Sequence, residues 1–125
     1  MVYLRNIPNE IDRIEPFTFS NCKKISNMII PDSVVSIGEY AFTSCIAMSE
    51  IMIPNRIEII DQAAFYMCSN LNILTLPRSI VSIGENAFAG CDRLVVTVSR
   101  DTYAQKYCEE NNLMYECNDS LDWIQ

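Results

Sequence analysis

Histidine is absent from the sequence. Histidine is the side chain that most often serves as a general base, and it takes part in Ser-His and Cys-His nucleophile pairs and in most mixed zinc sites. The Asp and Glu residues also lack the Asp-x-Asp-x-Asp spacing of a calcium-binding loop. We therefore expect no catalytic residues, no metal site and no cofactor, and we do not expect the protein to be an enzyme.

Long apolar runs and a basic excess are missing as well. The apolar runs are a few residues long, far short of the ~18 residues that cross a bilayer. Nine Lys and Arg oppose sixteen Asp and Glu, and the net charge of −7 repels phosphate backbones and anionic lipid headgroups. We expect no nucleic-acid partner and no membrane insertion. The first ten residues, MVYLRNIPNE, lack the pattern of a secretory signal, so the chain as written is expected to be cytoplasmic.

What the sequence does contain is repetition. SVVSIGEYAFTSC at 33–45 returns as SIVSIGENAFAGC at 79–91, and RIEIIDQAAFYMC at 56–68 lies midway between them. A rougher copy, NEIDRIEPFTFSNC, occupies 9–22, so the period is 23 residues. A fixed period of about 20 to 50 residues is typical of a repeat architecture. We divide the single domain, 1–125, into a degraded first repeat 1–22, regular repeats 23–45, 46–68 and 69–91, a strand-helix-strand cap 92–117, and a tail 118–125.

Each regular repeat opens with a short alternating segment that ends at a proline, such as Met28 and Ile30 before Pro31. This pattern predicts one short strand per repeat, and such strands stack in parallel. Gly38 and Gly84 share one turn position, where we expect either a positive φ or a close backbone approach. The closing AFTSC or AFAGC unit is interpreted as a helical turn that packs alanine and phenylalanine under the strand.

Two side chains recur with the period and are predicted to form buried ladders: Cys22, Cys45, Cys68 and Cys91, and Phe19, Phe42, Phe65 and Phe88. A buried thiol behaves as a small hydrophobe, so we expect free thiols. Equivalent cysteines of adjacent coils, which we call rungs of the ladder, lie ~4.8 Å apart, within the distance that a disulfide spans. Their side chains point the same way, however, whereas a disulfide needs them to point toward each other. Stacked rungs also form a line, which cannot place four thiolates around a metal. A Cys108–Cys117 disulfide remains an alternative to two buried thiols.

The cap is predicted to contain a last strand, a helix and a final strand. Ser99 or Asp101 is expected to cap the helix, and Asn111 and Asn112 to end it. The helix would bury one face and the final strand would alternate, with these apolar positions: Leu94, Val96, Val98, Tyr103, Ala104, Tyr107, Cys108, Leu113, Tyr115 and Cys117. The tail carries Leu121, Trp123 and Ile124, which either pack over the cap or stay loose.

The pattern Cys-x-x-Leu-x-x-Ile-x-Ile-Pro-x-Ser-Val-x-x-Ile-Gly-x-x-Ala-Phe-x-x-Cys, carried by residues 48–91, resembles the BspA-like class of leucine-rich repeats. VVTVSRDTYAQKYCEENNLMYEC at 95–117 is similar to the segment that closes such arrays. The resemblance implies an α/β fold: a right-handed solenoid with a parallel sheet on one side and short helical turns and loops on the other. The resemblance also implies that the protein is an adhesin, which binds host or cell-surface proteins. It implies a secreted or cell-surface location if the chain belongs to a longer family member.

The alternation within the strands sends two rows of side chains outward. One row is Leu4, Asn27, Glu50 and Ile73, and the other is Asn6, Ile29, Met52 and Thr75. An apolar patch around Ile29, Met52 and Ile73 would mark a protein-binding surface, whereas the alternative is a set of strand-forming residues left on an open sheet. The function predicted is therefore a non-catalytic protein-interaction module, adhesin-like in type. The alternative is a structural repeat unit or a homo-oligomer building block, with a homodimer formed through this face.

Overall fold

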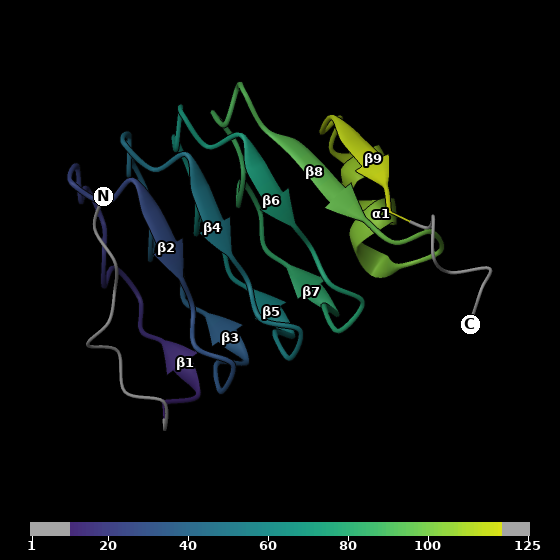
Figure 1. Cartoon of the computed structure of the whole chain (residues 1–125), viewed down its shortest axis with the longest axis horizontal. Coiled ribbons are helices and arrows are strands. Elements are labelled where there is room, and N and C mark those ends of the chain that lie inside the picture. The colour runs from purple at the N-terminus through teal and green to yellow at the C-terminus, as the bar shows by residue number, and fades with distance from the viewer. Residues whose placement is uncertain (1–10, 119–125) are drawn as a thin grey trace.

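The computed structural model describes residues 11–118 as a solenoid with two parallel sheets (Figure 1). The larger sheet has the order β2-β4-β6-β8-β9, with bounds Asn27–Ile29, Glu50–Met52, Ile73–Thr75, Val95–Val98 and Tyr115–Cys117. The smaller sheet has the order β1-β3-β5-β7, with bounds Arg13–Ile14, Ser36–Ile37, Ile59–Ile60 and Ser82–Ile83. The predicted solenoid with a parallel sheet on one side is confirmed. The smaller sheet was not predicted, because two-residue strands show no alternation in sequence.

The register of both sheets follows the repeat. Asn27 pairs with Glu50 in the larger sheet and Ser36 with Ile59 in the smaller one, and both steps are 23 residues. The step from Ile73 to Val95 is 22 residues, because the last coil lost one residue between Cys91 and β8. Successive coils therefore stack with equivalent side chains above one another, apart from this single slip.

The third side of each coil is a stack of turns and not the helical turn that we predicted. Tyr40 and Ser44 have left-handed φ values of 56° and 58°, which no helix contains. The Tyr40, Phe42 and Ser44 N–H groups donate to the next coil, with Phe42 N 2.8 Å from Ala64 O. The three N–H groups that alternate with them, from Ala41 to Cys45, donate to carbonyls three residues earlier in the same coil. Every backbone donor of the turn is thus paired, which offsets the cost of the two left-handed residues.

Gly38 and Gly84 are required by close approach and not by a positive φ. A Cβ at Gly38 would lie 2.7 Å from Pro16 N, and one at Gly84 would overlap the backbone of Gln62. Both obstacles are backbone atoms of the preceding coil, so they cannot rotate aside. Of the glycines in the described residues, only Gly90, at φ 82°, is left-handed.

Phe42, Phe65 and Phe88 of the phenylalanine ladder are buried in the core, whereas Phe19, which was also predicted to be buried, is half-buried. Successive rings of Phe19, Phe42, Phe65 and Phe88 stack with centroids 5.3, 5.2 and 5.3 Å apart. The ladder ends against Tyr107 of α1, which meets Phe88 edge to face at 6.4 Å. Because each ring covers the next, no coil buries its own phenylalanine alone.

The cap contains α1, Tyr103–Glu110, which is the only helix within residues 11–118. Its N-cap is Thr102, whose hydroxyl accepts from Gln105 N at 3.1 Å, so the predicted caps Ser99 and Asp101 are wrong. Asp101 has φ 63° and cannot adopt the extended conformation that an N-cap needs. The helix ends at Asn111 as predicted, and Ala104, Tyr107 and Cys108 form its buried face.

The final strand β9 lies parallel to β8 at the end of the sheet (Figure 1). Tyr115 is half-buried, but Cys117 is exposed and therefore does not continue the apolar alternation that we predicted. Cys108 is buried, and both cysteines are free. The tail residues Leu121, Trp123 and Ile124 lie outside the described residues.

Candidate protein-binding surface

The larger sheet has one buried and one exposed face. Met28, Ile51, Leu74 and Val96 point inward and are at most 2% exposed. The side chains on either side of them point outward, which places the predicted residues Asn27, Ile29, Glu50, Met52, Ile73 and Thr75 on the exposed face. Leu4 and Asn6 lie outside the described residues.

The apolar members of this face are strongly exposed. Ile29, Met52 and Ile73 expose 53, 56 and 56% of their surface, respectively. The sequence interpretation missed Val95 and Met114, which expose 40 and 70%. The predicted outward rows ended at the last regular repeat, so they left out Val95 of the last strand and Met114 of the cap. The usable signal was the alternation within the last two strands.

These five residues form one band, which we call the apolar stripe: Ile29, Met52, Ile73, Val95 and Met114. Ile29 is in register with Met52, and Ile73 is in register with Val95. Met52 and Ile73 lie diagonally on neighbouring strands, because the residue opposite Ile73 is Glu50. Val96 N donates to Met114 O at 2.9 Å, which places Met114 beside β8. The stripe therefore crosses β2, β4, β6 and β8 and reaches Met114, the residue before β9. It shifts by two residues between β4 and β6.

Polar residues border the stripe on both sides. Asn27 and Glu50 lie on one side, and the Ser49 hydroxyl bonds to the Asn27 side chain at 3.3 Å. Thr75, Thr97 and Glu116 lie on the other side, in register with one another. A band of apolar side chains with polar margins is the usual composition of a protein-binding surface.

The outward face of the smaller sheet has no such band. Ile59 is flanked in register by Ser36 and Ser82, so each apolar side chain there has polar neighbours. Val81 is 63% exposed and lies just before β7, in the turn from the preceding proline. The same repeat thus builds one face with a continuous apolar band and one without.

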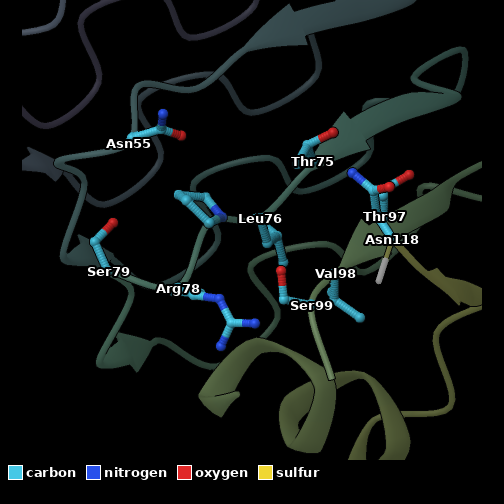
Figure 2. Close-up of a pocket in the computed structure, with 10 residues that line it drawn as sticks. Asn55, Thr75, Leu76, Arg78, Ser79, Thr97, Val98, Ser99 and Asn118 are labelled. Atoms are coloured by element: carbon cyan, nitrogen blue, oxygen red, sulfur yellow. The ribbon is translucent and has the colours of Figure 1, made fainter. Parts of the chain in front are cut away.

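Two shallow hollows lie at the carboxyl ends of the larger sheet's strands. One, of about 380 Å³, lies between the corner that carries Asn55 and Ser79 and the ends of β6 and β8 at Thr75 and Thr97 (Figure 2). The other, of about 240 Å³, contains Ile29, Met52 and Asp32 and shares Asn55 with the first. The second hollow continues the apolar stripe over the edge of the sheet.

Three thiols of the cysteine ladder are hydrogen-bonded between coils. The Cys45, Cys68 and Cys91 thiols donate to Phe19 O, Phe42 O and Phe65 O of the preceding coil at 3.1, 3.0 and 3.1 Å. The hydrogen bond with Cys68, together with burial, raises the pKa of Cys45, so this thiol stays protonated. Burial likewise raises the pKa of Cys108 to about 11. The hydrogen bond with Cys68 instead lowers the pKa of Cys91. Protonated, buried thiols such as Cys45 and Cys108 are poor nucleophiles and poor metal ligands.

Residues 11–118 contain neither a group of side chains suited to a metal ion nor a membrane-spanning helix. That part of the chain holds no group of three or more Cys, Asp or Glu side chains arranged to bind a metal ion. Its one helix, of eight residues, is too short to cross a membrane.

Comparison with known protein families identifies the repeat. The model of the BspA-type leucine-rich repeat region matches residues 4–115, with six copies. The chain belongs to the BspA-type leucine-rich repeat family. No match was found among curated proteins.

Solved structures of bacterial leucine-rich repeat proteins share the fold. A leucine-rich repeat protein from Bacteroides ovatus is 31% identical with a TM-score of 0.74, over 84% of this chain and 28% of its own. A leucine-rich cell surface protein from Faecalibacterium prausnitzii is 31% identical with a TM-score of 0.75, over 93% of this chain and 32% of its own. A pneumococcal vaccine antigen, at 23% identity and a TM-score of 0.64 over 77% of this chain and 27% of its own, shares the fold alone. The chain thus spans about a third of these proteins or less.

Proposed function

We propose that this BspA-type repeat chain is a non-catalytic protein-interaction module that binds a protein partner through the exposed face of its larger sheet. The observation that carries the proposal is the apolar stripe, which runs across β2, β4, β6 and β8 to the residue before β9. Exposed apolar side chains that adjoin one another are costly in water and are typical of a surface that is covered by a partner. Leucine-rich repeats generally serve as protein-interaction scaffolds, which supports the same function.

Adhesion is the specific form of this function that we propose. The partner would be a protein of another cell or of the extracellular matrix, and the chain would act as part of a surface-located protein. The F. prausnitzii neighbour is a cell surface protein, and this supports the location. The chain's charge of −7 favours partners with a basic surface, because opposite charges steer association.

The test is binding of the purified chain to a panel of immobilised extracellular-matrix proteins, measured by surface plasmon resonance. We expect saturable binding to at least one of them. Ile29→Glu combined with Met52→Glu is expected to weaken it at least tenfold, because two charges would be desolvated in the contact. Val81→Glu is the matched control on the other face and is expected to leave the affinity unchanged. Equal loss in both variants, or no loss in either, would refute the sheet face as the binding surface.

A second copy of the chain is the alternative occupant of the same face. Sedimentation velocity at two concentrations separates the two possibilities. A dimer that forms with rising concentration and is lost in the Ile29→Glu, Met52→Glu double variant would identify a homo-oligomer building block. A monomer at both concentrations leaves the face available for a different protein.

A further inference from the structure

The shape of the apolar stripe restricts the kind of partner that fits it, given the binding function proposed above. Neighbouring strands are ~4.8 Å apart. The stripe spans four such intervals, from β2 to the residue before β9, and is therefore about 19 Å long. The strands of this sheet are mostly three residues long, which makes the face about 10 Å wide. Its projected area of roughly 200 Å² is far below the ~800 Å² that each partner buries in a standard interface between folded proteins. One secondary-structure element of a partner is therefore enough to cover the stripe.

The spacing of the rungs favours a helix over an extended chain. Side chains on one face of a strand repeat every ~6.7 Å, whereas a helix presents one face every ~5.4 Å. The apolar residues of the stripe lie on neighbouring strands, ~4.8 Å apart. Over the four intervals between Ile29 and Met114, the side-chain spacing of a partner strand would deviate from the strand spacing by about 8 Å in total, and that of a helix by only about 2 Å. A stripe of about 19 Å corresponds to a helix of about 13 residues. Its apolar positions at i, i+3 or i+4 and i+7 would meet successive rungs of the stripe.

The charges that border the stripe indicate the flanks of that helix. Glu50 lies on one side of the stripe and Glu116 on the other. The remaining outward positions of β2 to β9 hold Asn27, Thr75 and Thr97 beside the apolar residues, so none of the outward strand positions is a lysine or arginine. Arg78 lies outside the strands, in the hollow beside Thr75 and Thr97. A helix lying along the stripe would therefore be favoured by basic residues on both sides of its apolar face.

We infer that the exposed face of the larger sheet binds a basic amphipathic helix of three to four turns. The helix lies across the strands along the apolar stripe, and its Lys or Arg residues flank that contact toward Glu50 and Glu116. Known domains bind amphipathic helices in apolar grooves. Here the helix would instead lie on a sheet face, where the regular spacing of the strands matches the spacing of its apolar side chains. The smaller sheet lacks both the band and the spacing of apolar residues, so it should not bind the same helix.

The probe is a 14-residue acetylated and amidated peptide with Leu at every third or fourth position, Lys beside them and Ala elsewhere. It carries a fluorophore, and binding to the full chain is followed by anisotropy. We expect saturable binding that is at least tenfold weaker for a scrambled peptide of the same composition. Replacing every Lys by Glu is also expected to weaken binding at least tenfold. Equal affinity for the designed and scrambled peptides, or no binding, would refute the inference.

Variants of the chain locate the contact. Met52→Glu is expected to weaken binding of the designed peptide at least tenfold, and the matched Val81→Glu control to leave it unchanged. Glu50→Lys with Glu116→Lys is expected to reverse the preference, so that the Glu-bearing peptide binds more tightly. An unchanged preference would refute the basic flanks, and loss of binding in Val81→Glu would refute the stripe as the site. Circular dichroism of each variant verifies that the fold is retained.

The outcomes distinguish this inference from the function on which it rests. If the stripe variants abolish binding to a matrix protein but the designed peptide does not bind, the helical partner is wrong and the interaction surface stands. If the stripe variants alter neither, both proposals fail together.

Discussion

The hydroxyl of Tyr103 lies 3.0 Å from the backbone N of Ile83 and accepts its hydrogen bond. Ile83 belongs to β7, the last strand of the smaller sheet, which has a strand on only one side. An open strand edge presents unpaired N–H groups that invite further strands to add. The first residue of the capping helix thus closes this sheet with a side chain, while the larger sheet is continued through β8 to β9.

Tyr103→Phe tests this closure. It removes the acceptor and leaves the Ile83 N–H unpaired, which is expected to lower the free energy of unfolding by about 1 to 3 kcal/mol. Urea unfolding measures the loss, and hydrogen exchange at Ile83 is expected to accelerate. Tyr66→Phe removes an exposed hydroxyl elsewhere and is the control. Equal stabilities of the two variants would show that the hydrogen bond contributes nothing.

The stacked rings predict a gradient of stability along the ladder. Phe65 is fully buried between two other rings, whereas Phe19 is half-buried with a ring on one side in the described residues. Phe65→Ala is expected to lower the free energy of unfolding by about 3 to 5 kcal/mol, and Phe19→Ala by distinctly less. Chemical denaturation of both variants measures the difference. Equal losses would contradict a continuous ladder in which central rungs carry the most contact.

The buried thiol of Cys108 and hydroxyl of Tyr107 predict a loss of stability at high pH. Burial raises the pKa of Cys108 from 9.0 to about 11, and that of Tyr107 from 10.0 to about 12. Between the unfolded and folded pKa values the unfolded chain binds fewer protons, so the free energy of unfolding falls as pH rises through this window. Denaturation at pH 8, 9, 10 and 11 measures the slope. Cys108→Ala is expected to flatten it above pH 9, and Cys117→Ala, which removes an exposed thiol, is expected to leave it unchanged.

The repeat allowed the larger sheet to be predicted from the sequence. Ile29 and Met52 were placed outward because Met28 and Ile30 alternate with them before a proline, and a pattern of period two survives in three residues. The two-residue strand Ser36–Ile37 is too short to alternate, so the second sheet was not foreseen. Short strands of this kind are recognised only through their neighbours in space.

The remaining differences between the predicted and the observed structure are local and arise from the backbone conformation. Ala41 and Phe42 were correctly placed in the core. The AFTSC segment does not indicate that Ser44 has a left-handed backbone, because glycine occupies the equivalent position only in the last repeat, as Gly90. Asp101 has the side chain of an N-cap but a left-handed backbone, so Thr102 takes that place. Val95 was missed because the outward rows were not extended beyond the last regular repeat. Local backbone conformation and register slips are decided by packing between coils, which a single repeat does not display.

The central claim is that partners are bound through the apolar stripe, and methyl NMR tests it most directly. The chain is labelled at its Ile and Met methyl groups and titrated with the designed amphipathic peptide or with a matrix protein that binds. The account predicts that the methyl signals of Ile29, Met52, Ile73 and Met114 shift or broaden, while those of Ile59 and Met67, which are exposed elsewhere, stay in place. Shifts confined to Ile59 and Met67, with the stripe signals unchanged, would contradict it.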